Sequence, residues 1–235
     1  MNNVILQMKK ELVKNSNAKT RNGAKRFFKE NIKLYGVKTA TVSKIGRKYF
    51  NQIKNGGKAE IFILCEKLWK SGYMEESFIA CRWSFALRKK YEPEDFKLFE
   101  RWIDDYIGNW ASCDTFCNHT MGAFLETYPE FLPQLKIWAR SKNRWMRRAS
   151  AVSLIVPAKR GKSLKDVFEI SDILLLDQDD MVQKGYGWLL KVASQTHEKE
   201  VFDYVMTNKS NMPRTALRYA IEKMPKSLKE KAMDK

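Results

Sequence analysis

The sequence predicts an all-α protein, built as a curved solenoid of helical hairpins with a basic concave face. Almost every segment carries apolar residues at helical spacing, and no alternating run is flanked by the Asn-Gly or Asp-Gly turns of a β-hairpin. Five stretches also align with one another at intervals of 34, 35, 36 and 31 residues, which is the period of helical-hairpin repeats. Hydrophobic residues make up 44% of the 235 residues, enough for one continuous core, so we expect a single repeat domain over residues 1–235.

Short apolar stripes between polar breaks predict the helices that lie outside the aligned stretches. These helices are expected at residues 4–13, 24–36, 39–53, 59–72, 92–108 and 128–141. Residues 15–23 form a polar break before the second of them, which should end near Gly36. Thr39 or Thr41 is a candidate N-cap for the third, and the KNGGK stretch at 54–58 is the clearest turn. The last two begin with acids or a proline, as helix N-termini commonly do.

Each of the five aligned stretches should supply one helix of a hairpin. They begin at residues 76, 111, 145, 181 and 212. Four of them place a small residue in one shared slot, and these residues are Ala80, Ala149, Gly185 and Ala216. The second stretch places Asp114 there. Because a carboxylate in a packing slot costs stability, we interpret Asp114 as a functional residue.

Two further signals concern helix ends. Pro157 should end the helix that begins near Trp145, because proline breaks helix interiors. The basic tail at 226–235 loses its aromatic residues and keeps its charges, so we expect it to fray.

Composition points to a polyanionic partner. The chain has 44 Lys and Arg against 27 Asp and Glu, a formal net charge of +17, which favours nucleic acid over a membrane surface. No apolar run reaches the length of a membrane span, and no signal peptide is apparent, so a reduced cytosolic compartment is expected. The four cysteines lie in apolar periodic segments and are predicted to pack in the core. Cys113, Cys117 and His119 do not share one helix face, so we predict no metal site.

Three neighbouring stretches could combine into a site for DNA. Trp110 and Asp114 are four residues apart and share a helix face. The next two helices add cations and one aromatic residue: Arg144, Arg147, Arg148, Lys184, Trp188 and Lys191. Cations suit phosphates, and aromatic rings suit a sugar or a base.

Each of these residues also has a structural interpretation. Trp110 and Trp188 could be packing residues of the repeats, since Trp83 and Tyr219 occupy the position that matches Trp188. Arg148 could simply neutralise Asp114 in a salt bridge. Asp114 could instead be an N-cap, because aspartate favours helix starts.

The stretches NWASCDTF, WMRRAS and KGYGWLLK, in this order, closely resemble the signature stretches of the AlkD-type HEAT-repeat DNA glycosylases, the DNA alkylation repair family. The upstream KRFFKENIKLYG is similar to that family too, and the resemblance covers almost the whole chain. It implies a right-handed solenoid of HEAT-like repeats. It also implies removal of N3- or N7-alkylated purines from duplex DNA, without swinging the lesion into a pocket, and with no cofactor.

The resemblance places the family's site residues on Asp114, Trp110, Trp188 and Arg148. Asp114 would stabilise the sugar cation, Arg148 would clamp a phosphate, and the two tryptophans would pack against the deoxyribose. Further DNA contacts are assigned to a second group of residues: Arg144, Arg147, Lys184, Lys191, Phe27, Lys29, Arg214 and Arg218. We expect a monofunctional, monomeric enzyme of the cytoplasm and nucleoid, acting on double-stranded DNA with alkylated purines.

The chain departs from the family pattern at four positions. Asn109 and Ala111 flank Trp110 where the family often has a second tryptophan and an acid, Phe27 stands where a tyrosine is common, and Ala40 replaces a proline. Relatives of this fold bind branched DNA and excise no base. A non-catalytic repeat protein that binds bent or branched DNA by shape is therefore the alternative function, followed by a scaffold for an acidic protein.

Overall fold

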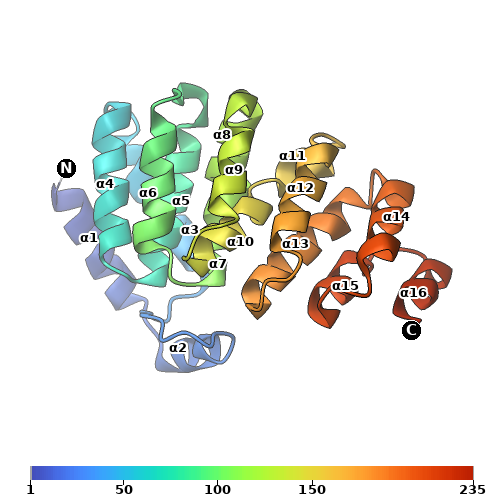
Figure 1. Ribbon diagram of the computed structural model, residues 1–235. Coiled ribbons are helices and arrows are strands. Elements are labelled where there is room, and N and C mark those ends of the chain that lie inside the picture. Colours follow the sequence, from blue (N-terminus) through green and yellow to red (C-terminus); the bar gives the residue numbers. More distant parts are fainter. Residues whose placement is uncertain (1, 235) are drawn as a thin grey trace. The chain divides into compact units, whose positions relative to one another are not determined.

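The computed structural model describes residues 2–234, and all regular structure in that range is helical (Figure 1). The all-α prediction is confirmed. Contacts divide the chain into two compact units, the first ending at Thr120 and the second beginning at Met121. The expectation of one domain over residues 1–235 stays a prediction, and its two terminal residues lie outside the described range.

The first unit consists of helical hairpins and one short arm, residues 18–29, which carries helix α2. Its helices are α1 (Asn2–Lys14), α2 (Ala18–Lys25), α3 (Thr39–Ile53), α4 (Lys58–Lys70), α5 (Met74–Ala86), η1 (Arg88–Lys90), α6 (Asp95–Tyr106) and α7 (Trp110–Phe116). Helices α4 and α5 form one hairpin, α5 also packs on α3 and α7, and α4 packs on α6. The predicted helix at 39–53 and the turn at 54–58 are confirmed, although Lys38 rather than a threonine is the N-cap residue of α3.

A cluster of aromatic rings fixes the position of α7. Phe116, which has no exposed surface, packs its ring edge-on against Trp69 of α4 at 5.7 Å and against Phe99 and Trp102 of α6 at 5.8 and 6.0 Å. Such edge-on pairs add to the stabilisation from burial. The short helix α7 is therefore held by its last residue against the core of α4 and α6.

The predicted helix at 24–36 is wrong. Helix α2 covers the stretch expected to be a polar break, because the Asn17 side chain accepts a hydrogen bond from the Thr20 N–H at 2.9 Å and caps the helix. Residues 28–38, the tethered segment, are then not helical: they bend at Lys29 and Glu30 and form an isolated parallel bridge between Lys33 and Tyr73. Ile32 and Leu34 are both buried while Lys33 between them is exposed, which is the alternation of an extended chain.

Glu75 at the start of α5 holds the tethered segment. Its carboxylate, only 2% exposed, accepts hydrogen bonds from three successive backbone N–H groups, those of Tyr35 (3.1 Å), Gly36 (2.8 Å) and Val37 (3.1 Å). Gly36 has φ of +85°, and a Cβ there would lie 2.4 Å from the Asn17 carbonyl oxygen, so only glycine fits. A charge-assisted clasp across about forty residues thus replaces the helix expected from local pattern.

The second unit repeats the hairpin design. A π-helical turn, η2 (Cys117–Met121), follows α7 and leads into the second unit. Its helices are α8 (Gly122–Thr127), η3 (Pro129–Phe131), α9 (Leu132–Trp138), α10 (Arg144–Val152), α11 (Ile155–Lys159), α12 (Leu164–Leu174), α13 (Asp180–Ala193), α14 (Glu198–Asn208), α15 (Arg214–Ala220) and α16 (Lys226–Met233). Helix α13 packs on both α10 and α15, so the last three of the aligned stretches form stacked helices.

Small residues let these stacked helices approach closely. Ala149 and Ala216 have no exposed surface. A Cβ on Gly187 would lie 2.8 Å from the Ala216 carbonyl oxygen and 2.7 Å from the Tyr219 Cβ. The predicted slot is therefore a real helix contact, and its tightest point is Gly187, two residues after the aligned Gly185.

Two expectations about helix ends turn out differently. Pro157 does not end the helix that begins near Trp145, because α10 already stops at Val152 and Pro157 lies in the first turn of α11. A proline is tolerated there, since first-turn N–H groups have no helical partner. Residues 226–233 of the basic tail form α16, whose Ala232 is buried, and fraying of that tail stays a prediction.

Candidate functional site

Asp114 lies on the half-exposed face of α7. Asn109 caps this helix by accepting a hydrogen bond from the Ser112 N–H at 2.9 Å, so Asp114 is the fifth helical residue and the N-cap interpretation is wrong. Cys113, Phe116 and Cys117 form the buried face. The expectation that Asp114 occupies a core slot is also wrong, because Asp114 is only partly buried while Cys113 before it is fully buried. Asp114 is therefore less desolvated than a carboxylate in a fully buried slot would be.

Trp110, one turn before Asp114, joins α7 to the arm that carries α2. Its ring stacks on Phe28 with 5.2 Å between centroids and an interplanar angle of 17°. Its indole N–H donates to the Phe27 carbonyl oxygen at 3.3 Å. The half-buried indole is thus positioned by the tethered segment, and it presents only part of its surface on the face that it shares with Asp114.

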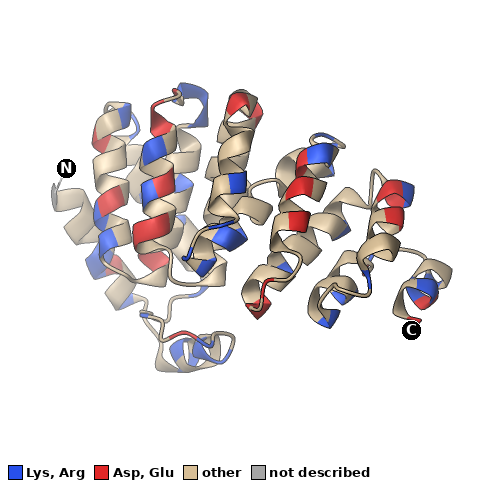
Figure 2. Cartoon of the chain, in the orientation of Figure 1, with Lys and Arg blue, Asp and Glu red and all other residues tan. Residues whose placement is uncertain are grey.

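The arm itself carries several exposed cations. Helix α2 has no buried residue and no acid, and its ribbon carries only blue charged segments in Figure 2. Phe27, two residues after the end of α2, is 76% exposed. Sequence reasoning assigned Phe27 and the exposed Lys29 to DNA but missed the neighbouring cations Lys19, Arg21, Lys25 and Arg26. A count of charge on exposed helix faces would have revealed them, had the polar break been recognised as a helix.

In the second unit, Arg148 is buried. It is 5% exposed, and a guanidinium N–H donates to the backbone carbonyl oxygen of Met181 in the first turn of α13. Gly185 makes room for it, because a Cβ there would lie 3.3 Å from the Arg148 Cγ. The small residue in this slot therefore accommodates an arginine that links α10 to α13, a role that the repeat alignment did not predict.

Four predicted DNA-binding cations of this unit form salt bridges. The pairs and their N–O distances are Arg144–Asp179 (2.8 Å), Arg147–Asp177 (2.6 Å), Lys184–Asp180 (3.2 Å) and Lys191–Glu222 (2.9 Å). Partly exposed pairs of this kind contribute only ~0–1 kcal/mol each, so phosphate oxygens can compete with the acids for these cations. Arg214 and Arg218 of α15 are exposed, and neither has a salt bridge among the described residues.

The matching aromatic positions of the repeats differ in exposure. Trp83 of α5 is fully buried and donates its indole N–H to the Gly46 carbonyl oxygen at 2.8 Å, so it is a packing residue. Trp188 of α13 is only partly buried. The packing interpretation therefore holds for Trp83, whereas Trp188 keeps surface that a ligand can contact.

The cysteines are core residues. All four are free and buried, and burial raises the pKa of the Cys65 thiol well above its ordinary value. Within residues 2–234, no group of three His, Cys, Asp or Glu side chains is arranged to hold a metal ion. No helix in the described range is long and apolar enough to cross a membrane.

Comparisons with known proteins agree with this architecture. A sequence model of the family described as DNA alkylation repair enzyme matches residues 8–224. No curated protein matches the sequence. Among solved structures, a predicted DNA alkylation repair enzyme from Enterococcus faecalis is similar with a TM-score of 0.81 at 15% identity, over 90% of this chain and 97% of that one. The protein smu.31 from Streptococcus mutans UA159 is similar with a TM-score of 0.58 at 18% identity, over 82% of this chain and 98% of that one.

Proposed function

Because this chain belongs to the DNA alkylation repair enzyme family, we propose that it is a DNA glycosylase that hydrolyses the N-glycosidic bond of N3- or N7-alkylated purines in duplex DNA. The observation that carries the proposal is the half-exposed carboxylate of Asp114 on a short helix, beside an indole held in place by the arm. The +17 charge supports a DNA partner.

The chemistry needs one carboxylate and no strong acid. Alkylation at N3 or N7 makes the base cationic, so the bond electrons leave with it and the base departs neutral. Positive charge develops on the sugar in the transition state, as in glycoside hydrolysis. Asp114 stabilises this charge electrostatically and orients the water that adds to C1′. Trp110 packs against the deoxyribose, and Trp188 of the second unit contacts the DNA. With no Schiff base formed, the strand stays intact.

Binding is distributed over cations of both units. The exposed Arg214 and Arg218 contact phosphates directly, together with Lys29 of the arm, and the exposed ring of Phe27 contacts the DNA through its apolar surface. The four salt-bridged cations contact phosphates by exchanging their acid partners. Arg148, whose guanidinium donates to the Met181 carbonyl oxygen, is assigned one phosphate contact in addition.

The test for catalysis is release of 7-methylguanine and 3-methyladenine from methylated duplex DNA. Asp114→Asn should lose at least about a hundredfold of the excision rate while keeping its affinity for DNA. Asp105→Asn, a change at an exposed acid on α6, is the matched control and should excise at the wild-type rate. Excision by Asp114→Asn at the wild-type rate would remove Asp114 from the mechanism. Absence of excision by the wild type, with DNA still bound, would favour the non-catalytic binder of bent or branched DNA.

The role of Arg148 is tested separately by salt dependence. If Arg148 binds one phosphate, Arg148→Ala should lower the slope of log affinity against log salt by about 0.9. Arg218→Ala is the exposed reference and should show the same change. An unchanged slope combined with a lower melting temperature would mean that Arg148 only links α10 to α13.

A further inference from the structure

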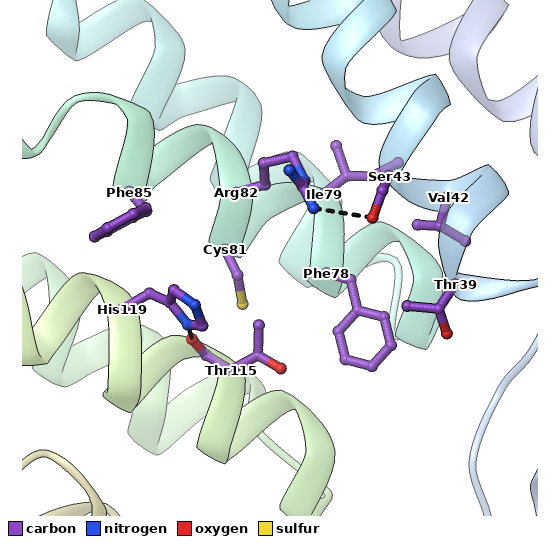
Figure 3. A pocket seen from close by; sticks show the side chains of 10 residues that line it. All are labelled: Thr39, Val42, Ser43, Phe78, Ile79, Cys81, Arg82, Phe85, Thr115 and His119. Carbon is purple, nitrogen blue, oxygen red and sulfur yellow. Dashed lines mark hydrogen bonds between the residues drawn. The ribbon is translucent and has the colours of Figure 1, made fainter. Parts of the chain in front are cut away.

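A cavity of about 330 Å³ opens in the first unit between α3, α5 and the segment formed by α7 and η2 (Figure 3). Its floor is apolar and consists of the buried side chains of Val42, Ile79 and Cys81. Phe78 and Phe85, both partly exposed, supply aromatic surface at its sides. None of these residues was assigned a function from the sequence.

The rim of the cavity offers hydrogen-bonding groups of both kinds. Arg82 donates to the Ser43 hydroxyl oxygen at 2.9 Å and keeps further N–H groups at an exposed position. His119 has its Nδ1 2.8 Å from the Thr115 carbonyl oxygen, which can only accept, so Nδ1 carries the proton. When the ring carries this one proton, Nε2 is an acceptor. Phe85 contacts the His119 ring edge-on at 5.3 Å and keeps it in place.

This lining matches a neutral, planar, nitrogen-rich ring. The ten lining residues include a cation and no acid, which disfavours a cationic ligand, and the apolar floor and aromatic sides disfavour a bare phosphate. The volume lies at the small end of the range for ligand pockets, which suits a single base. Donor and acceptor at the rim correspond to the mixed donors and acceptors on base edges.

We propose that this cavity binds a neutral nucleobase outside the base stack, against Phe78 and Phe85 and with its edge at Arg82 and His119. The inference rests on the proposed function, since it takes DNA as the source of the base. Thr115 of the lining directly follows Asp114, so the base site begins next to the residue proposed to act on the sugar. The base comes either from the strand, as an unpaired residue, or from the reaction, as the released neutral purine.

The experiment uses 2-aminopurine as a fluorescent base. The full chain is titrated with three probes: a duplex with one bulged 2-aminopurine, the same duplex without the bulge, and the free base. Phe85→Ala should weaken binding of the bulged duplex or of the free base about tenfold, as expected when one stacking interaction is removed, and leave the paired duplex unchanged. Arg82→Ala should weaken binding of the same probes by a few fold. Because Arg82 is exposed, this second variant tests the site even if Phe85→Ala does not fold correctly. Phe202→Ala, a partly exposed phenylalanine of α14, is the matched control.

The probes separate the two sources and the two proposals. If Phe85→Ala weakens binding of the free base, the ligand of the cavity is the released base. If Phe85→Ala weakens binding of the bulged duplex alone, the ligand is an unpaired base of the strand. Equal affinities of Phe85→Ala, Arg82→Ala and wild type for every probe would overturn the base site while excision of alkylpurines could still stand. If no duplex binds to the wild type and the free base still does, the base site survives and the proposed glycosylase fails.

Discussion

Replacing Glu75 by alanine should release the tethered segment from the start of α5. The three N–H groups that this carboxylate accepts belong to consecutive residues, and no other side chain is hydrogen-bonded to them within the described chain. In Glu75→Ala these donors either stay buried without an acceptor or move to water. If the three N–H groups moved to water, Ile32 and Leu34 would also leave the core, because both are buried and lie only a few residues before them in the chain.

The magnitude follows from the number of hydrogen bonds and from burial. A hydrogen bond to a charged group contributes ~1.5–3 kcal/mol, and a buried N–H donor left without its acceptor costs about 1–3 kcal/mol. Because the three bonds share one carboxylate, their contributions do not simply add, and we expect a loss of about 4 kcal/mol for Glu75→Ala. Glu75→Gln should lose about 2 kcal/mol, because its NH₂ group must face one of the three N–H donors and cannot accept from it.

Two measurements check this expectation. Urea unfolding of wild type, Glu75→Ala and Glu75→Gln gives the free energies, with Glu94→Gln, an exposed change near the start of α6, as a control that should shift stability by under about 0.5 kcal/mol. Hydrogen exchange of the Tyr35, Gly36 and Val37 amides should accelerate in Glu75→Ala. Unaltered protection of these amides together with a stability loss below about 1 kcal/mol would refute the clasp.

Three further predictions concern packing, charge and thiols. Gly187→Ala should destabilise by about 2 kcal/mol, because its methyl group would lie 2.7 Å from the Tyr219 Cβ, whereas Gly23→Ala in α2 has no neighbour within 4 Å and should stabilise by about 0.5 kcal/mol; equal melting temperatures would contradict this. The Glu66 carboxylate accepts from Arg101 through two bonds of 2.8 Å, which lower its pKa from 4.5 to about 2. Since a lowered pKa stabilises the folded state only above the unfolded value, about 1 kcal/mol should be lost between pH 4.5 and 2. An acid titration of Arg101→Ala should show a smaller loss, because Lys70 and Tyr106 still contact the carboxylate. The four buried thiols should resist a thiol reagent in the folded protein and react fully in urea, so rapid labelling of native protein would be inconsistent with their burial.

Repeat spacing predicted more of the fold than local pattern did. The stacked helices α10, α13 and α15 follow from the alignment of small residues, because helices can approach closely only where side chains are small. The tethered segment could not be predicted in the same way. Its conformation depends on Glu75, about forty residues away in the chain, although the alternation of Ile32, Lys33 and Leu34 was a local signal for extended backbone.

The sequence predicted which residues belong to the candidate site better than it predicted the contacts that these residues make. Spacing placed Trp110 and Asp114 on one helix face, and both are partly exposed there. It could not show that Trp110 stacks on Phe28, because that contact joins residues more than eighty positions apart. Nor could it show the burial of Arg148, which depends on the absent side chain of Gly185.

Helix α2 contributes no buried residue, and the arm that carries it is held through the Asn17 cap, the Glu75 clasp and the contacts of Trp110 with Phe27 and Phe28. None of these contacts is made by a basic side chain of α2, so those side chains can change without loss of the anchoring contacts. Substitutions at these basic positions should therefore change the electrostatic attraction of the protein to its partner while leaving its melting temperature unchanged.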